Sequence, residues 1–176
     1  DIEWFDGNIP SVDALIDSAP VQEASRLDDE VLKKIASDCH SALQKNELQK
    51  LLTKENGNVC VYLEQDFMLR VEKGTSFAEV IMQEPTDIRG SIDRLVVHSD
   101  EHGKVIRAEV IDWKSDVFEN ETIEQKIEHY APQLATYRLA AAKLLNIHVE
   151  DVKAVLAFLI EEKIEDITDK ASVECP

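Results

Sequence analysis

The chain has 176 residues, of which 44% are hydrophobic and 31% are charged. This length and composition fit a single soluble globular domain that can bury a core without disulfides or metals to hold it together. No apolar run approaches the roughly 20 residues of a membrane span, and no basic and apolar leader opens the chain. We therefore expect neither membrane insertion nor secretion.

Three cysteines, Cys39, Cys60 and Cys175, lie far apart and show none of the spacings of zinc or iron–sulfur sites. We interpret them as isolated thiols of a reducing compartment and expect a cytoplasmic protein. The chain begins at Asp1 rather than at a methionine, from which we expect an excised domain or a processed chain.

The net charge of −17 argues at first against a nucleic-acid partner, because phosphate binding draws on Lys and Arg. The acidity is mostly peripheral: residues 1–30 hold nine acids and one base, and residues 147–176 hold eight acids and three bases. Residues 31–146 carry 19 acids and 15 bases, so the charge there is nearly balanced. The charge weakens the case for DNA binding without excluding it.

Residues 1–30 carry Pro10 and Pro20 and one short periodic stretch, "SVDALIDSA", so we expect an irregular acidic N-terminal segment with one short helix. From Asp28 to Thr53, apolar residues recur mainly at steps of three and four, which predicts one or two amphipathic helices.

After the turn signal at residues 56–58, β-branched and aromatic residues predict strands. We expect strands within "ENGNVCVYLEQDFMLRVEKG", "SFAEVIM", "DIRGSIDRLVVH", "KVIRAEVIDWKS" and "VKAVLAFLI". A hairpin-like turn, "SDEHG", joins the third and fourth, and a helix within "ETIEQKIEHYAPQLATYRLAAAKLLN" precedes the last. The order predicts an α/β (α+β) fold in one domain, residues 1–176: a central mixed sheet of about four to five strands flanked by helices.

Asp112 and Lys114 end one predicted strand with two charges. Because side chains alternate along a strand, both face one side, with Trp113 on the other. Asp93 stands in the preceding strand, and the hairpin can bring it beside Asp112, where two carboxylates repel unless a cation lies between them. Taken alone, the pattern is explained better by a solvated ion pair at a strand end, because Asp-x-Lys is frequent by chance.

Three stretches together resemble the RecB-type (AddA-like) nuclease domain of the PD-(D/E)XK superfamily. They are "RGSIDRLVV" (89–97), "AEVIDWKSD" (108–116) and "YAPQLATY" (130–137), in the order of that family, with Ser115 in place of the usual threonine. The resemblance implies a restriction-endonuclease-like catalytic core at residues 57–161. It also implies a metal-dependent deoxyribonuclease, an exonuclease more than an endonuclease, excised from a helicase–nuclease of DNA repair and recombination.

The resemblance further implies roles for individual residues. Asp93 and Asp112 correspond to the metal-binding carboxylates, for Mg²⁺ or Mn²⁺. Lys114 corresponds to the catalytic lysine that positions the attacking water, and the backbone carbonyl of Trp113 to a further metal ligand. Glu64 resembles an acidic residue of the family's first strand, and a third acidic ligand and a plain strand glutamate are equal alternatives for it.

Gln133 and Tyr137 match the family's Q-x-x-x-Y element, and their i, i+4 spacing places both on one helix face, toward the active site. Tyr130 lies on nearly the same face. Pro132 is then expected in the first turn of the helix, where its missing N–H is tolerated. Taken alone, Gln133 and Tyr137 are explained by polar contacts of an amphipathic helix.

The family usually carries a metal-binding histidine on a helix ahead of these motifs, and no such helix is found. Either that ligand lies upstream of Asp1, or the protein binds metal less tightly. His40, the one helical histidine ahead of the motifs, is interpreted as a solvated or half-buried neutral residue. His98, His102 and His129 share no ligand spacing.

DNA, as a single strand or a duplex end, is the partner that the resemblance implies, delivered by a helicase domain that is fused or in a complex. The chain has no G-x-x-x-x-G-K-[ST] loop and cannot hydrolyse ATP by that route. We expect weak DNA affinity in isolation and action at the nucleoid. The rival hypothesis is a catalytically inert nuclease-like module with a structural or protein-interaction role in a repair complex, which the acidic termini and the missing histidine favour.

Overall fold

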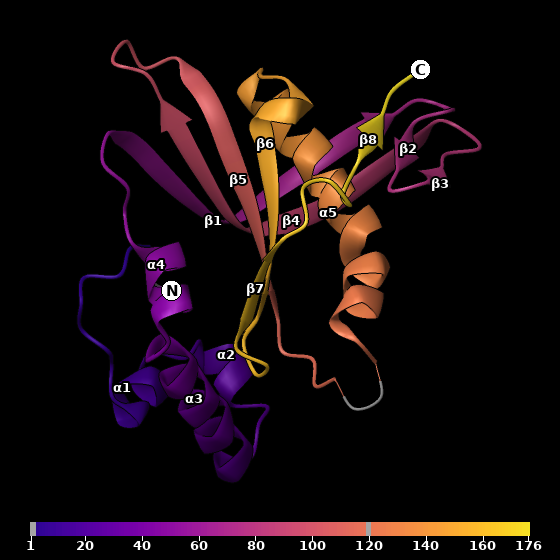
Figure 1. Ribbon diagram of the computed structural model, residues 1–176. Coiled ribbons are helices and arrows are strands. Elements are labelled where there is room, and N and C mark those ends of the chain that lie inside the picture. Colours follow the sequence, from indigo (N-terminus) through magenta and orange to yellow (C-terminus); the bar gives the residue numbers. More distant parts are fainter. Residues whose placement is uncertain (1–2, 119–120) are drawn as a thin grey trace.

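The computed structural model describes residues 3–118 and 121–176, and its centre is a five-stranded mixed sheet of order β1-β4-β5-β6-β7 (Figure 1). The strands are β1 (Asn58–Val71), β4 (Thr86–Ser99), β5 (Val105–Lys114), β6 (Val152–Phe158) and β7 (Lys163–Asp166). β5 and β6 are parallel, whereas the other neighbouring pairs are antiparallel. The predicted α/β class and mixed central sheet are confirmed.

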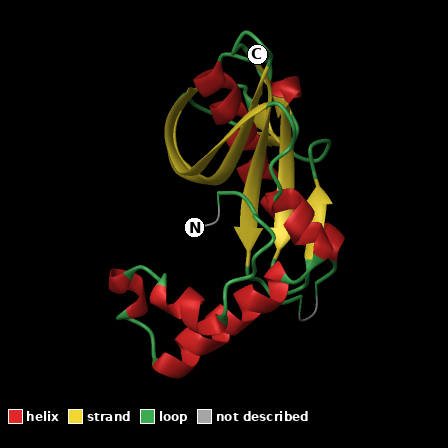
Figure 2. Ribbon diagram, turned by 90° about the vertical axis from the view of Figure 1, so that its left-hand side faces the viewer, coloured by secondary structure: helices red, strands yellow, loops and turns green. Residues whose placement is uncertain are grey.

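Helices lie against this sheet in two groups. Helix α5 (Ile123–Leu145) connects the parallel strands β5 and β6, which need a crossover of this kind, and a short 3-10 helix, η1 (Val149–Asp151), leads into β6. The other group gathers at one end of the molecule, as Figure 2 shows. It comprises α1 (Val12–Asp17), α2 (Val21–Ala24), α3 (Asp29–Leu43) and α4 (Asn46–Leu52).

The predicted strand "SFAEVIM" is instead a tight hairpin outside the central sheet. β2 (Ser76–Phe77) and β3 (Val80–Ile81) pair with β8 (Val173–Glu174) in a separate sheet of order β3-β2-β8. Ala78 and Glu79 both have positive φ, 45° and 73°, so the chain reverses where a single strand would have continued.

The central sheet is buried on both faces. The larger core lies between the sheet and α5 and includes Ile92, Val110, Leu134 and Leu156. On the opposite face, Val96 and Ile111 belong to a second cluster that Leu51 of α4 covers. Within residues 3–118 and 121–176, no helix combines the length and the apolar character that crossing a membrane requires.

Helix α5 begins at Ile123, nine residues before Pro132. Thr122 and Gln125 form a capping box, in which the Gln125 backbone N–H donates to the Thr122 hydroxyl and the Thr122 N–H donates to the Gln125 side chain. Pro132 therefore lies inside the helix, and the prediction of a first-turn proline is wrong. The proline leaves the carbonyl four residues before it, on Glu128, without its usual helical partner.

A buried arginine ties α5 to the C-terminal part of the chain. The Arg138 guanidinium donates to four backbone carbonyls, those of Val149, Val152, Thr168 and Ala171, at 2.6 to 3.1 Å. Since a guanidinium has five donors and no acceptor, this ring of carbonyls satisfies most of a side chain that is only 6% exposed.

Gly90 in β4 lies where two aromatic rings approach the strand. A Cβ at this position would lie 2.9 Å from the Phe67 ring and 3.7 Å from the Tyr137 ring. The two rings pack edge to face, with centroids 5.7 Å apart. The absence of a side chain at Gly90 thus places Phe67 beneath Tyr137 of α5.

We expect Gly90→Ala to lower the free energy of unfolding by about 1–3 kcal/mol, because the added methyl must displace a buried ring. Chemical denaturation measures the change. Ser91→Ala is the matched control: the Ser91 hydroxyl has no hydrogen-bond partner among the described residues, so stability should change by less than about 0.5 kcal/mol. Equal stability of the Gly90→Ala protein and the parent would contradict this account of the packing.

Candidate active site

Strand pairing brings the two predicted metal-binding aspartates together. β4 and β5 are paired as far as Arg94 opposite Ile111, and Asp93 and Asp112 are the next residues along the two strands. The Asp93 carboxylate accepts a hydrogen bond from the backbone N–H of Trp113 at 2.9 Å. This hydrogen bond holds the Asp93 side chain beside Trp113, the residue that follows Asp112.

Asp112 and Lys114 form a buried ion pair. The Lys114 Nζ lies 2.5 Å from the Asp112 Oδ2, and the two side chains are 14% and 3% exposed. Burial raises the pKa of the Asp112 carboxyl to about 6, although Lys114 acts in the opposite direction, and the charges of Asp93 and Asp116 raise it further. The solvated ion pair that the spacing alone favoured is therefore wrong.

Helix α5 adds an amide to this pair. Gln133 donates to the Tyr137 hydroxyl at 2.8 Å and to the Asp112 Oδ1 at 3.4 Å, and its Oε1 accepts from Lys114 at 3.2 Å. The i, i+4 face of the helix thus points at the strand end. Gln133 connects both members of the ion pair to Tyr137.

Tyr130, one helical turn before Gln133, covers the lysine. Its ring centroid lies 4.1 Å from the Lys114 Nζ, and its hydroxyl donates a hydrogen bond to the Asp116 carboxylate. Burial, followed by the contact with Asp116, raises the pKa of Tyr130 to about 12, which keeps the hydroxyl a donor. Asp116 was not among the predicted site residues, although it ends the "DWKSD" motif.

Glu64 lies at an irregularity of β1. It has φ of 49°, which is uncommon outside glycine, and it interrupts the pairing of β1 with β4 opposite Asp93. Glu64, Asp93 and Trp113 line one cavity of about 260 Å³. Burial raises the pKa of the Tyr137 hydroxyl, the hydrogen bond with Gln133 acts in the opposite direction, and the charges of Asp112, Asp93 and Glu64 raise it further.

The residues present fit a divalent metal ion. The Asp112 Oδ2 faces the Lys114 ammonium but accepts no geometrically sound hydrogen bond from any described residue. Asp93 adds a second carboxylate, whose charge acts on Asp112, and Glu64 shares a cavity with Asp93. The ligand atoms of these three acids do not all lie within 4.8 Å of one another, so a bound ion would have to draw them together. Carboxylate oxygens are the hard ligands that Mg²⁺ prefers.

His40 makes other contacts. It lies half-buried on α3, where its Nδ1 lies 2.8 Å from the Pro10 carbonyl and its Nε2 lies 2.9 Å from the Gln44 amide. Its neighbour Cys39 lines the cavity that holds Glu64 and Asp93. The interpretation of His40 as a half-buried residue is confirmed.

A group of side chains with ligand atoms close enough to share a metal lies elsewhere on the sheet. Glu55, His98 and Glu109 offer ligand atoms that all lie within 4.8 Å of one another. His98 follows Asp93 by five residues on β4, which places the group on the order of 15 Å along the strand from the aspartates. Sequence reasoning missed this group, because its members share no spacing along the chain.

The mixed central sheet with its flanking helices is consistent with a restriction-endonuclease-like fold. The family model of the PD-(D/E)XK nuclease superfamily matches residues 9–174, and the chain belongs to this superfamily. Nucleases of this superfamily generally use divalent metals, so membership implies a metal-dependent nuclease. No curated protein matches the chain.

We expect the buried Asp112 to make the metal-free protein less stable as pH rises. Its pKa is about 6 in the folded state against 3.8 in the unfolded state, so between these values the folded state binds more protons. From pH 4 to pH 7 the free energy of unfolding should fall by on the order of 2 kcal/mol relative to Asp112→Asn, which cannot titrate.

Urea unfolding in EDTA across this pH range measures the difference. A stability difference between Asp112→Asn and the parent that stays constant with pH would show that burial does not raise the pKa of this carboxyl.

Proposed function

We propose that the protein hydrolyses phosphodiester bonds of DNA with the help of Mg²⁺ or Mn²⁺, and that it acts as an exonuclease rather than an endonuclease. The observation that supports this most directly is the buried Asp112–Lys114 pair beside Asp93. A buried ion pair is weak evidence for stability, since apolar residues of similar size often do as well. Its presence at a strand end is therefore better explained by chemistry.

Asp93 and Asp112 would hold the metal, with the Trp113 carbonyl as a further ligand and Glu64 as a third carboxylate. When bound, the metal supplies a Lewis acid that polarises the scissile phosphate and lowers the pKa of water. The burial of Asp112 excludes competing solvent from this carboxylate, which strengthens its electrostatic interactions.

Lys114 would position the attacking water and stabilise the negative charge that develops on the phosphate. Three contacts orient its ammonium: the Asp112 carboxylate, the Gln133 amide and the Tyr130 ring. Such fixed orientation is what makes an amine effective in the transition state, because little reorganisation is then needed. The products would carry 5′-phosphate and 3′-hydroxyl ends.

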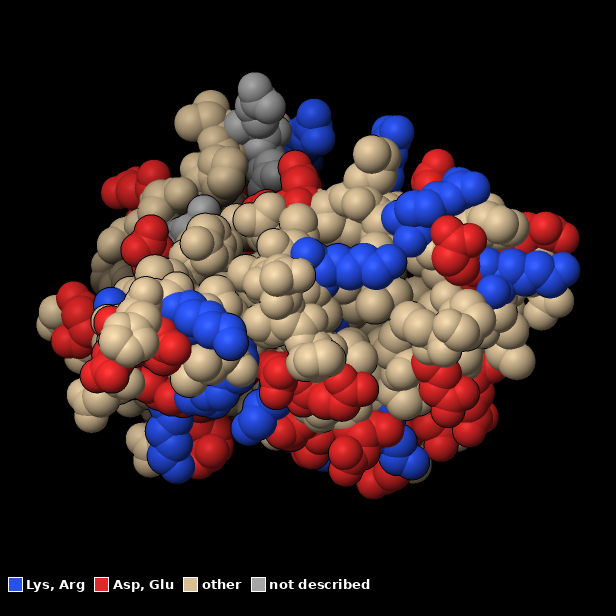
Figure 3. Space-filling view, turned by 90° about the horizontal axis from the view of Figure 1, so that it is seen from above, with Lys and Arg blue, Asp and Glu red and all other residues tan. Residues whose placement is uncertain are grey.

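A helicase, fused or in a complex, would deliver the DNA during repair or recombination at the nucleoid of the cytoplasm. The acidity of the chain supports dependence on such a partner, because phosphate contacts need Lys and Arg. Figure 3 shows the end of the molecule away from α1–α4, where acidic side chains gather along one edge and Lys and Arg are dispersed. No continuous basic surface covers the described residues in this view.

The second candidate function is an inert nuclease-like module that serves a protein contact within a repair complex. The acidic termini favour it, as do the contacts of His40, whose two ring nitrogens face Pro10 and Gln44. An inert module gives no reason for Asp93, Asp112 and Lys114 to lie together.

We expect the parent protein to degrade linear single-stranded DNA with Mg²⁺ or Mn²⁺, and Asp112→Asn and Lys114→Met to lose at least about 100-fold in rate. Gel analysis of end-labelled DNA measures the rates, with EDTA as the metal-free reference. Lys104→Met, an exposed lysine in the β4–β5 turn, is the control and should keep the parent rate.

Covalently closed circular single strands separate the two modes of cleavage: an exonuclease leaves them intact, whereas an endonuclease opens them. Equal cleavage of linear DNA by the parent and both active-site variants would end the catalytic assignment. If the parent cleaves nothing and calorimetry detects no Mn²⁺ binding near millimolar metal, the inert module is the correct function.

We expect the Tyr130 ring to matter more for catalysis than its hydroxyl. Tyr130→Phe keeps the ring against the Lys114 ammonium and should lower kcat by less than about threefold, whereas Tyr130→Leu should lower it about tenfold, as loss of a partly desolvated cation–π contact predicts. Steady-state kinetics on linear DNA compare the two variants. Similar losses for both would instead assign the effect to the hydrogen bond with Asp116.

A further inference from the structure

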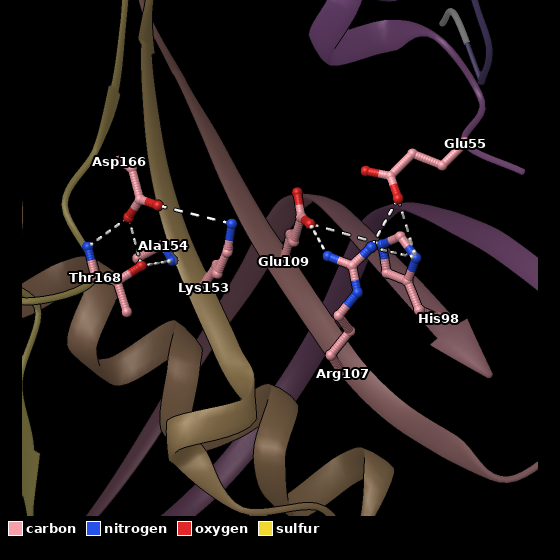
Figure 4. A network of polar contacts seen from close by, with 8 residues as sticks. All are labelled: Glu55, His98, Arg107, Glu109, Lys153, Ala154, Asp166 and Thr168. Atoms are coloured by element: carbon pink, nitrogen blue, oxygen red, sulfur yellow. Dashed lines mark hydrogen bonds and ion pairs between the residues drawn. The ribbon is translucent and has the colours of Figure 1, made fainter. Parts of the chain in front are cut away.

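The group formed by Glu55, His98 and Glu109 joins three separate segments (Figure 4). Glu55 lies in the connection between α4 and β1, His98 lies on β4, and Glu109 lies on β5. His98 pairs with Arg107 across the strands, and Glu109 follows Arg107 by two residues, so these side chains share one face of the sheet. Glu55, His98 and Glu109 all line one cavity of about 290 Å³.

The His98 imidazole is buried, and only one of its two ring nitrogens has a hydrogen-bond partner among the described residues. The residue is 5% exposed, and its Nε2 has no hydrogen-bond partner among the described residues. The Glu109 Oε1 lies 3.6 Å from this nitrogen, which is beyond hydrogen-bond distance. A buried polar atom without a partner is uncommon and calls for an explanation, of which an ion is one.

An irregularity of the sheet lies beside this cavity. The register of β4 against β5 shifts between His98 and Ser99. Such bulges re-aim a side chain, and they are common next to functional sites.

The positive charge of Arg107 lies among these three side chains. Its guanidinium donates to the Glu55 carboxylate at 2.7 Å, to the Glu109 carboxylate at 3.0 Å and to the His98 Nδ1 at 3.1 Å. Because Nδ1 accepts from Arg107, the proton of a neutral ring lies on Nε2, where it finds no acceptor. The Arg107 side chain is 39% exposed, so it can move into solvent, whereas the imidazole cannot.

We propose that Glu55, His98 and Glu109 form a second metal site, for a divalent ion of the zinc class, and that Arg107 substitutes for the ion when none is bound. An imidazole with two carboxylates suits Zn²⁺, Co²⁺ or Mn²⁺, whereas the all-oxygen group around Asp112 suits Mg²⁺. Three protein ligands leave a coordination position open toward the cavity. Burial also lowers the pKa of His98, in keeping with the neutral form that a ligand must have.

The site would link the helical group to the sheet. Glu55 follows α4 by three residues, and the cavity is also lined by Leu51 and Thr53 at the end of that helix. An ion shared by Glu55 and the two strand residues would therefore fix α4 against the sheet. Since an ion that binds only the folded protein stabilises it by mass action, saturating Zn²⁺ should raise the melting temperature.

The experiment uses the whole chain carrying Asp93→Asn and Asp112→Asn, so that ions at the nuclease residues do not contribute. Calorimetry with Zn²⁺ and visible absorption with Co²⁺ should show one equivalent bound, with a rise in melting temperature on saturation. Adding His98→Gln should abolish both signals. Adding Arg107→Gln should tighten binding by about tenfold, which corresponds to about 1.4 kcal/mol, because the competing cation is gone.

Glu55→Gln, at a half-exposed position outside the strands, gives the same test should His98→Gln fold poorly, and it should weaken Zn²⁺ binding at least about tenfold. If neither the protein with Asp93→Asn and Asp112→Asn nor its Arg107→Gln derivative binds Zn²⁺, the proposal is overturned. Arg107 is then the permanent partner of the two carboxylates. Binding that persists unchanged in His98→Gln would overturn it as well. Neither result bears on DNA cleavage, which the two nuclease aspartates govern separately.

Discussion

The burial of one carboxylate, that of Asp112, is the constraint on which the arrangement of the site depends. A charge in this position is unfavourable unless it is paired, and Lys114 two residues later on the same strand supplies the partner at 2.5 Å. The pair in turn needs hydrogen-bonding groups for its remaining atoms, and Gln133 provides them from the helix above. Lys114 and Gln133 are thus the groups that satisfy this one buried carboxylate.

Sheet topology explains why helix α5 supplies the hydrogen-bonding groups for this ion pair. β5 and β6 are parallel neighbours, so the chain must cross one face of the sheet between them. The crossover begins eight residues after Lys114, at the Thr122 cap, and its residues 130–137 pass over the end of β5. Tyr130, Gln133 and Tyr137 are thus brought to the charged strand end by the route of the chain itself.

Much of this arrangement could be predicted from the sequence because it follows local periodicity. Alternation along "KVIRAEVIDWKS" gives a strand with Asp112 and Lys114 on one face, and the three- and four-residue steps of residues 28–53 give two helices, α3 and α4. The misses arise where pairing between distant residues decides the outcome. The left-handed backbone of Glu64, the hairpin at Ala78 and Glu79, and the meeting of Glu55 with His98 leave no periodic trace in the chain.

The ring of carbonyls around Arg138 has a consequence for how the domain opens. The guanidinium joins the crossover helix to η1, to the start of β6 and to the loop after β7, so none of these segments can detach without exposing the others. Lysine, with a compact ammonium and three donors, could not reach all four acceptors. The last ten residues are therefore not an independent tail: they share a single cooperative unit with the helix that carries Gln133 and Tyr137.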